Sequence, residues 1–472
     1  MTHFYFYDLE TWGADPKRDR IAQFAGQRTD LAFNPVAAPS SFYCQLAPDY
    51  LPDPQAVLIT GIVPQLCQQK GLCEAEFTRR IAQEWLQTPD TCVVGYNNIR
   101  FDDEMMRYAF FRNFIEPYAR EWQQGNSRWD LLDVVRACYA LRPDGVIWPI
   151  KDDGSPSFKL EDLTKANNLS HQKAHDALSD VQATIAVAAL IKQAQPRLFD
   201  YLYQHRSKQA LLSLIDVAGL TPLVHVSGMF PATQGCISWV VPLAFHPQQK
   251  NAVICIDLQQ DPSIWQDIDV EQLRELLYRA KAELADGEQR PALKLVHLNK
   301  SPVLAPAKTL SAERAAELGI NRALCLKHLE LLKQHASIRQ KLIAVYDAER
   351  EYAAETTAEY ALYGGFLKPN DQQLVAQLSS LDALAQRPTP LFQDDRLNQL
   401  WPRFKARNFY GSLDHHEQQQ WLQYCRDRLQ LGVDKPPRTI DDFVLQIENL
   451  LETATDTQKK LLQQLFQFVN QF

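Results

Sequence analysis

The sequence has no CxxC pair, no long apolar run and no low-complexity tract. Its nine cysteines are scattered singly, so neither a zinc knuckle nor a disulfide framework is indicated, and we expect reduced thiols. No apolar stretch approaches the roughly 18–20 residues that a membrane span needs, and the N-terminus lacks a basic region followed by a signal core. These absences lead us to expect a cytoplasmic protein that does not associate with a membrane.

An excess of positive charge is also missing. The 49 lysines and arginines are outnumbered by 57 acidic residues, which gives a formal net charge of −8. Proteins that bind nucleic acid without sequence preference are usually basic, so this balance argues weakly against such a role. It does not exclude a protein whose acids cluster at a metal site while its bases line one groove.

The residues that are present predict more than one domain. At 472 residues the chain is too long for a single core. Up to about residue 195 strands alternate with helices, which is typical of a mixed sheet flanked by helices. We expect strands at residues 3–11, 21–29, 41–46 and 92–96 and helices at 74–86, 104–114, 129–141, 158–167 and 176–194.

The pattern changes after a polar stretch at residues 203–208. Short apolar segments then indicate a small β-rich region, compatible with a barrel. From about residue 311 to the end, nearly every segment has a helical period. We expect the β-rich region to contain strands at 223–226, 237–243, 252–258 and 293–298 and a helix at 270–284.

The first predicted strand ends in two acids, Asp8 and Glu10. Side chains alternate along a strand, so both carboxylates point to one face, with Cα atoms roughly 6–7 Å apart. Neighbouring carboxylates repel each other, and a divalent cation between them would relieve that repulsion. The alternative is a strand that ends in a polar turn with Glu10 in solvent.

A third acid, Asp102, lies where the loop after the strand at 92–96 enters the next helix. Aspartate is a favoured helix N-cap, so Asp102 could have only this structural role. Asp103 beside it could cap the helix instead. Taken alone, Asp102 therefore does not indicate a functional site.

A histidine and a carboxylate meet at the start of the last helix of the α/β region. The spacing of Val181 and Ile185 places the helix start close to Asp176, which can cap it. His175 then lies just outside the helix and Asp180 one turn inside it, so both can face the same volume. The alternative is a surface histidine beside a solvated aspartate.

Asp8, Glu10, Asp102, His175 and Asp180 together form an ordered pattern: DxE, a mid-domain aspartate, then HxxxxD. This pattern resembles the signature of the DEDDh 3′→5′ exonucleases, which have a ribonuclease-H-like fold. The flanking sequence is similar to the bacterial exodeoxyribonuclease I family over nearly the whole chain. The segments that carry the similarity are residues 7–13, 95–103, 157–164, 174–177, 196–202, 301–308 and 406–411.

The resemblance implies a three-domain architecture. Residues 1–195 would form an α/β ribonuclease-H-like exonuclease domain with a mixed sheet. Residues 196–348 would form a small β-rich SH3-like barrel domain, and residues 349–472 an α-helical C-terminal domain. In the family these domains enclose the strand, which would favour processive digestion, and we expect a monomer.

The resemblance also implies an activity, which is hydrolysis of single-stranded DNA in the 3′→5′ direction with release of 5′-mononucleotides, in DNA repair and recombination. Two Mg²⁺ ions about 3.5–4 Å apart would clamp the attacking and leaving oxygens, with Mn²⁺ as a substitute. Histidine ordinarily titrates near neutrality, which suits His175 as the general base. The predicted metal ligands are Asp8, Glu10, Asp102 and Asp180.

Contacts to DNA are predicted with less support from the residues themselves. Single-stranded DNA is generally held by stacking aromatics in a cationic groove. The stretch at 401–410 interleaves bases with aromatics, and it fits either such a surface or a helical face followed by a turn. In the family, the segment after the first acid and nearby aromatics pack against the terminal base and sugar, which selects Leu9, Thr11 and Trp12. Lys159 is a further candidate for contact with the strand.

A protein partner is implied by the resemblance alone. The family docks the acidic C-terminal tail of single-stranded DNA-binding protein in a basic pocket, and a basic clamp suits a peptide carboxylate. The matching positions here are Arg142, Tyr201 and Arg339.

Two other functions compete with this one. An RNA-directed DEDDh exoribonuclease would keep the same site, but its usual chain is much shorter and lacks the two later domains. A non-catalytic single-strand-binding module could retain the fold. Such a module has no use for four converging acids, so the pattern favours the enzyme.

Overall fold

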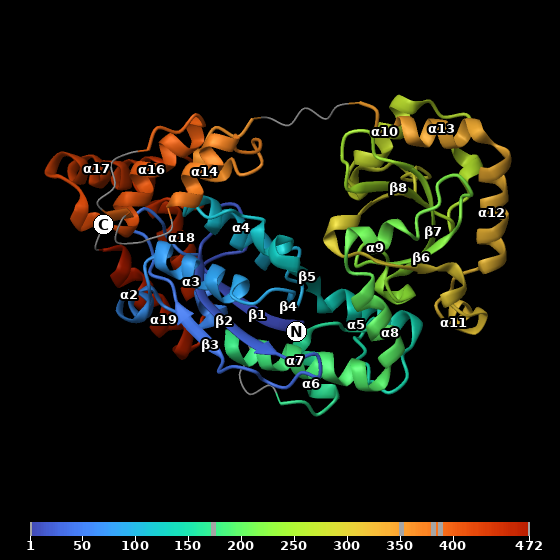
Figure 1. The fold of residues 1–472 in the computed structure, drawn as a ribbon, viewed down its shortest axis with the longest axis horizontal. Helices are drawn as coiled ribbons and strands as arrows, with labels where there is room; N and C mark the ends of the chain where they lie inside the picture. The colour runs from blue at the N-terminus through green and yellow to red at the C-terminus, as the bar shows by residue number, and fades with distance from the viewer. Residues whose placement is uncertain (1, 171–175, 349–353, 379–383, 386–389, 471–472) are drawn as a thin grey trace. The chain divides into compact units, whose positions relative to one another are not determined.

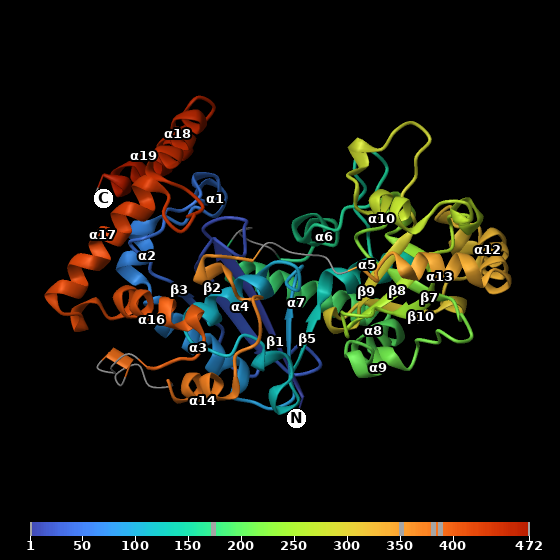
Figure 2. The same ribbon diagram turned by 90° about the horizontal axis from the view of Figure 1, so that it is seen from above.

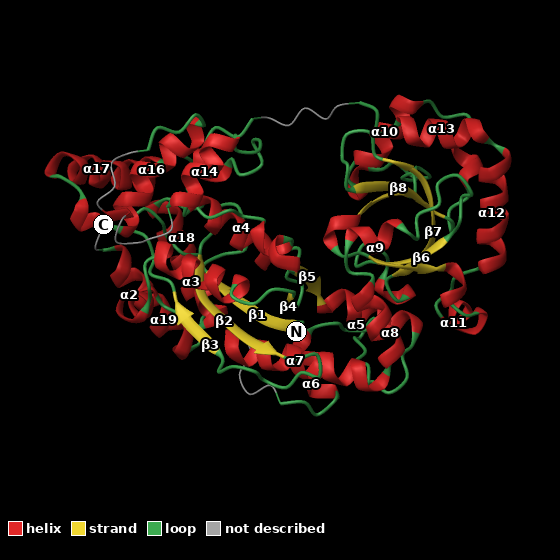
Figure 3. Ribbon diagram, in the orientation of Figure 1, coloured by secondary structure: helices red, strands yellow, loops and turns green. Residues whose placement is uncertain are grey.

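The computed structural model describes residues 2–170, 176–348, 354–378, 384–385 and 390–470, with the elements labelled in Figure 1. They form two compact units. The first consists of residues 1–128, 171–185 and 353–472, and the second of residues 129–170 and 186–352. The described residues form two five-stranded sheets, whose strands are yellow in Figure 3. No described helix is long and apolar enough to cross a membrane.

The first sheet is mixed and has β1 at its centre, in the order β3-β2-β1-β4-β5. β1 pairs antiparallel with β2 from Phe4 to Thr11 and parallel with β4 from His3 to Phe6, so its N-terminal half has partners on both edges. A strand paired on both sides is held more rigidly than an edge strand. The strands are β1 (His3–Thr11), β2 (Ile21–Thr29), β3 (Ser40–Tyr43), β4 (Thr91–Gly95) and β5 (Ser127–Asp130).

The alternation of β1 gives the two faces of the sheet different roles. Tyr5, Tyr7 and Leu9 are buried in one core cluster with side chains of the helices that follow β3 and β4. Asp8 and Glu10 alternate with them and so face the opposite side. The aromatic side chains thus anchor the strand on one face and leave the acids on the other.

The C-terminal helices of the first unit pack on its N-terminal part. Trp12 and Val57 share a core cluster with Phe443 and Leu462, and Figure 2 shows α18 and α19 beside α1. The helices with residues in this unit are α1 (Pro54–Thr60), α2 (Pro64–Lys70), α3 (Glu74–Leu86), α4 (Asp102–Arg112), α7 (Ala177–Ala194), α14 (Pro369–Gln377), α16 (Asp395–Asn408), α17 (His415–Leu431), α18 (Ile440–Leu451) and α19 (Asp456–Val469).

The second unit contains an antiparallel sheet in the order β10-β6-β7-β8-β9. Its strands are β6 (Leu223–Val226), β7 (Ile237–Phe245), β8 (Ala252–Asp257), β9 (Leu293–His297) and β10 (Val303–Pro306). Its helices are α5 (Leu131–Leu141), α6 (Leu160–Ala166), α8 (Pro196–Gln204), α9 (Lys208–Leu212), α10 (Val270–Tyr278), α11 (Ala312–Glu317), α12 (Arg322–Gln334) and α13 (Ala336–Ala344).

Most predicted elements are present, and the exceptions have local causes. The helix expected at 129–141 begins later, because β5 continues to Asp130, whose carboxylate accepts the N–H of Leu132 at 3.0 Å and caps α5. β10 was not predicted as a strand. It contains Pro306, which is tolerated because β10 lies at an edge of the sheet.

Buried ion pairs tie the C-terminal helices to the N-terminal part of the first unit. Arg407 on α16 donates to Asp49 at 3.0 and 2.5 Å, and it also contacts Glu359. Arg20 bridges Glu359, at 3.1 Å, and Glu74, at 3.2 Å. All these side chains are at most 10% exposed, so losing one partner would leave a buried charge uncompensated.

Glu74 generates a prediction about acid stability. Burial alone would raise the pKa of Glu74, but Arg112, at 2.9 Å, and Arg20 lower it to about 2. An unfolded glutamate titrates near pH 4.3, so this stabilisation is complete above that pH and is lost as the pH falls toward 2. We expect the contribution of Glu74 to the free energy of unfolding to fall by about 2 kcal/mol between pH 6 and pH 3.

Glu74→Gln should therefore be less stable than the wild type at pH 6 and should lose less stability between pH 6 and pH 3. Urea unfolding, followed by tryptophan fluorescence, measures the free energy of unfolding at each pH. Glu452→Gln, at an exposed position after α18, is the control and should behave as the wild type. Identical pH profiles for the wild type and Glu74→Gln would contradict this account.

Candidate active site

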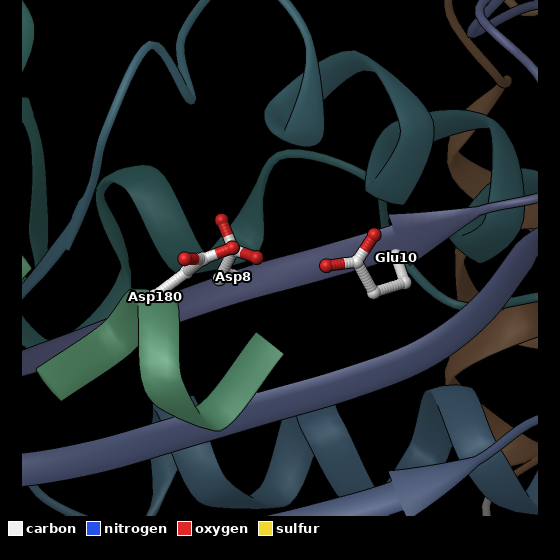
Figure 4. A group of neighbouring side chains, drawn as sticks. All are labelled: Asp8, Glu10 and Asp180. Atoms are coloured by element: carbon white, nitrogen blue, oxygen red, sulfur yellow. The ribbon is translucent and has the colours of Figure 1, made fainter. Parts of the chain in front are cut away.

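Three carboxylates converge on the face of the first sheet opposite its aromatic core. Asp8 and Glu10 lie on β1 and Asp180 lies in the first turn of α7. Each offers an oxygen that lies within 4.8 Å of the others. Figure 4 shows the side chain of Asp180 meeting that of Asp8, with the Glu10 carboxylate directed toward them. The structure thus brings together three of the four predicted ligands as a group that could hold a metal ion.

The two acids on β1 resist ionisation in the absence of a cation. Burial raises the pKa of Asp8 well above its ordinary value, and the charges of Asp102, Glu10 and Asp180 raise it further. Burial and the charges of Asp180 and Asp176 raise the pKa of Glu10 to about 8. Folding alone gains nothing from this repulsion. A divalent cation favours the ionised forms, and carboxylate oxygens are the ligands that Mg²⁺ and Mn²⁺ prefer.

Asp102 lies next to the group but is not one of its three members. It is the first residue of α4 and is 6% exposed. Its N-cap role is not realised, because the cap position belongs to Phe101 and no side chain caps the helix there. Its charge is the largest contribution from another acid to the raised pKa of Asp8. The charge of Asp102 therefore acts on Asp8 in the site. Direct binding of a metal ion by Asp102 stays a prediction.

The start of α7 positions a further acid. Asp176 accepts the N–H of Ser179 at 3.2 Å, so it caps the helix as its position in the sequence indicates. Its charge also raises the pKa of Glu10, a contribution that the sequence pattern did not reveal. His175, the predicted general base, lies outside the described residues.

Asp103 has a role that the sequence did not show. Its carboxylate is fully buried and accepts hydrogen bonds from Tyr7, Arg120 and Arg128. The arginines follow it by 17 and 25 residues, so no local spacing marks them as its partners. Only its position beside Asp102 distinguished it in the sequence.

The predicted DNA-contacting residues have different surroundings. Leu9 and Trp12 are 6% and 1% exposed and belong to two core clusters of the first unit. The hydroxyl of Thr11 donates to the carbonyl of Gly13 at 2.8 Å. Lys159 is exposed and precedes α6 in the second unit. Contact of these four residues with DNA stays a prediction.

The stretch at 401–410 lies mostly on α16, with its first two aromatics directed inward. Trp401 and Phe404 are at most 1% exposed and pack in one core cluster. Arg407 is held by buried acids, whereas Tyr410 is 41% exposed. Of the two interpretations, the structure favours the helical face and turn for most of this stretch.

The predicted peptide-binding residues all lie in the second unit. Arg142 donates to the carbonyl of Thr309 at 3.1 Å, and the hydroxyl of Tyr201 donates to the carbonyl of Leu304 on β10 at 3.1 Å. Both therefore adjoin the chain from β10 to Thr309. Arg339, on α13, donates instead to the carbonyls of Leu332 and Lys333 at the end of α12.

Three family models match the chain. The model described as Exonuclease matches residues 5–188. The Exonuclease I SH3-like domain matches residues 206–348, and the Exonuclease I C-terminal domain matches residues 356–472. The fold and the acidic group therefore define an exonuclease in which an α/β domain with a mixed sheet is followed by an SH3-like and a helical domain, as predicted.

Whole-chain comparisons give the particular family. Exodeoxyribonuclease I of Haemophilus influenzae is 48% identical over 469 residues, which cover 98% of each chain. A crystal structure of E. coli exonuclease I in complex with a dA16 oligonucleotide has a TM-score of 0.94 and 47% identity, with 100% of each chain covered. The chain belongs to the exodeoxyribonuclease I family.

Two further similar structures, the first from E. coli, show exonuclease I with other molecules. The zinc ion bound form of its complex with single-stranded DNA has a TM-score of 0.93 and 46% identity, and covers 100% of this chain and 99% of that one. A structure of SSB/exonuclease I in complex with the inhibitor CFAM has a TM-score of 0.88 and 45% identity, with the same coverage.

The geometry predicts that Asp180 is needed for metal binding in the absence of DNA. Asp180→Asn removes one of three converging carboxylates and should weaken Mn²⁺ binding by more than about tenfold in isothermal titration calorimetry. Asp441→Asn, an exposed acid in the first turn of α18, is the matched control and should bind as the wild type. Unchanged Mn²⁺ affinity in Asp180→Asn would refute the assignment.

Proposed function

We propose that this protein hydrolyses single-stranded DNA from its 3′ end and releases 5′-mononucleotides. The observation that carries the proposal is the group of Asp8, Glu10 and Asp180 within a domain that matches the Exonuclease family model. The E. coli relative is 47% identical to this chain, and its structure in complex with a dA16 oligonucleotide supports single-stranded DNA as the substrate. Repair and recombination are the settings in which such a reaction is used.

The donor chemistry of the site fits Mg²⁺. All donors in the group are carboxylate oxygens, and hard oxygen ligands suit Mg²⁺, with Mn²⁺ as a substitute. When bound, two such ions would neutralise phosphate charge and activate water. We assign ligand roles to Asp8, Glu10, Asp102 and Asp180. Their geometry depends on the pairing of β1 in the sheet and on the capped start of α7.

His175 is proposed to accept the proton of the attacking water. Its position in the HxxxxD pattern and the ordinary titration range of histidine support this role. Because a bound cation also activates water, loss of His175 should slow the reaction severely, but less completely than loss of a ligand acid.

The later domains favour DNA over RNA as the substrate. An RNA-directed exonuclease with the same acids would not need the SH3-like and C-terminal domains that match residues 206–348 and 356–472. A non-catalytic binding module would not need an acidic group whose members raise the pKa of one another. We retain the domain boundaries at residues 195 and 348 as part of the proposal.

Single-stranded DNA-binding protein is the proposed partner. The structure of SSB/exonuclease I, which is 45% identical to this chain, supports the pairing. We propose that its acidic C-terminal tail docks at Arg142 and Tyr201, which both adjoin the chain from β10 to Thr309, with Arg339 as a further contact. A monomer that acts in the cytoplasm completes the proposal.

Labelled oligonucleotides test the direction and the substrate together. A DNA strand labelled at its 3′ end should lose the label as a mononucleotide at once, whereas a 5′ label should remain on shortening fragments. The RNA equivalent should be degraded far more slowly. Equal rates on RNA and DNA, or a preference for RNA, would replace this function with the RNA-directed alternative.

The same assay separates catalysis from binding when it is repeated with Asp180→Ala. Loss of one converging acid should abolish nucleotide release while fluorescence anisotropy shows binding of the strand largely intact. Full turnover by Asp180→Ala would contradict the role of the acids.

A further inference from the structure

The residues next to two of the acids are joined to each other. Tyr7 precedes Asp8 on β1, and Asp103 follows Asp102 at the start of α4. The hydroxyl of Tyr7 donates to Oδ1 of Asp103 at 2.6 Å. Tyr7 is 2% exposed and Asp103 is 0% exposed, so no water competes for this hydrogen bond. One short buried contact thus connects the strand and the helix that carry Asp8 and Asp102.

Two arginines fix the acceptor end of this contact. Arg120 Nη1 donates to Oδ1 of Asp103 at 2.8 Å, and Arg128 Nη1 donates to Oδ2 at 2.8 Å. Arg120 also reaches the main-chain carbonyl of Asp103 at 3.3 Å. Charge-assisted hydrogen bonds between buried groups are strong and directional. The Asp103 carboxylate therefore has little freedom to rotate away from Tyr7.

The contact lies behind the acids. Along β1 the side chain of Tyr7 belongs to the buried core cluster, while Asp8 points to the opposite face. Tyr7 also packs edge-on against Trp85, with ring centroids 5.0 Å apart, on this core side. Neither Tyr7 nor Asp103 can touch the substrate from there. Their effect on the reaction must pass through the positions of Asp8 and Asp102.

Repulsion between the two acids is the force that the Tyr7–Asp103 hydrogen bond would oppose. When Asp8 and Asp102 are both ionised, their charges repel each other, which raises the energy of the metal-free site and tends to separate β1 from α4. We propose that the Tyr7–Asp103 hydrogen bond holds Asp8 and Asp102 at the spacing that divalent cations require. Tyr7 and Asp103 are then positioning residues, an inference that rests on the proposed metal-dependent nuclease function.

Tyr7→Phe tests the inference because it removes one hydroxyl and leaves the pairs of Asp103 with both arginines. Tyr5→Phe is the matched control. Tyr5 lies on the same strand and in the same core cluster, and its hydroxyl donates to Glu84 on α3, an acid outside the site. Each variant loses one tyrosine-to-carboxylate hydrogen bond, buried at Tyr7 and partly buried at Tyr5, but only Tyr7→Phe loses the link beside the predicted ligands.

Mn²⁺ binding to each protein in the absence of DNA, measured by electron paramagnetic resonance, is the primary measurement. Tyr7→Phe should bind Mn²⁺ about 10–100-fold more weakly than the wild type, as expected when the support of a metal ligand is lost. Tyr5→Phe should bind as the wild type. Nucleotide release by Tyr7→Phe should need correspondingly more Mg²⁺ for half-maximal rate, with an unchanged KM for DNA.

Wild-type Mn²⁺ affinity in Tyr7→Phe, or equal weakening in both variants, would overturn the inference. Asp103→Asn should weaken Mn²⁺ binding at least as much as Tyr7→Phe if it folds; should its two buried arginines prevent folding, Tyr7→Phe decides alone. Failure of the proposed function gives a different result, because the wild type would then bind Mn²⁺ without releasing nucleotides.

Discussion

Several carboxylates are held close together on one face of β1. Their mutual repulsion is the constraint on which the rest of the first unit depends. Asp8, Glu10 and Asp180 converge within 4.8 Å, and Asp102 adds its charge from α4. In the absence of a cation this arrangement favours protonated acids and opposes folding. Such a group persists only when the surrounding structure holds it, and it becomes favourable when divalent cations occupy it.

The fold opposes that repulsion from the side of the sheet that the acids do not occupy. β1 pairs with β2 as far as Thr11 and with β4 from His3 to Phe6, and its alternate residues Tyr5, Tyr7 and Leu9 are buried against α3 and α4. The ion pairs of Arg407 and Arg20 fasten α16 and the segment at Glu359 to the N-terminal part of the unit. Rigid elements rather than loops therefore carry the three converging acids.

The sequence predicted those features of the site that depend on local geometry. Alternation along a strand placed Asp8 and Glu10 on one face, and the cap at Asp176 placed Asp180 one turn inside α7. The family resemblance added the fold of three domains, which the family models confirm. Each of these inferences needed only neighbouring residues or an ordered motif.

The partners of Asp103 and Glu359 could not be predicted in the same way. Arg128 and Arg407 lie 25 and 48 residues from them in the chain, and arginines at such distances carry no periodic signal. The aromatic stretch at 401–410 stayed open between two interpretations for a related reason. Composition cannot tell a DNA-stacking surface from the buried side of α16 until the packing partners of Trp401 are known.

Anomalous diffraction from crystals grown with Mn²⁺ tests whether the converging carboxylates hold a metal, because it locates the cation without reference to activity. We expect an anomalous peak within coordination distance of the carboxylates of Asp8, Glu10 and Asp180, which lie together in the structure. Mn²⁺ bound only elsewhere on the protein, with these carboxylates left without metal, would contradict this expectation.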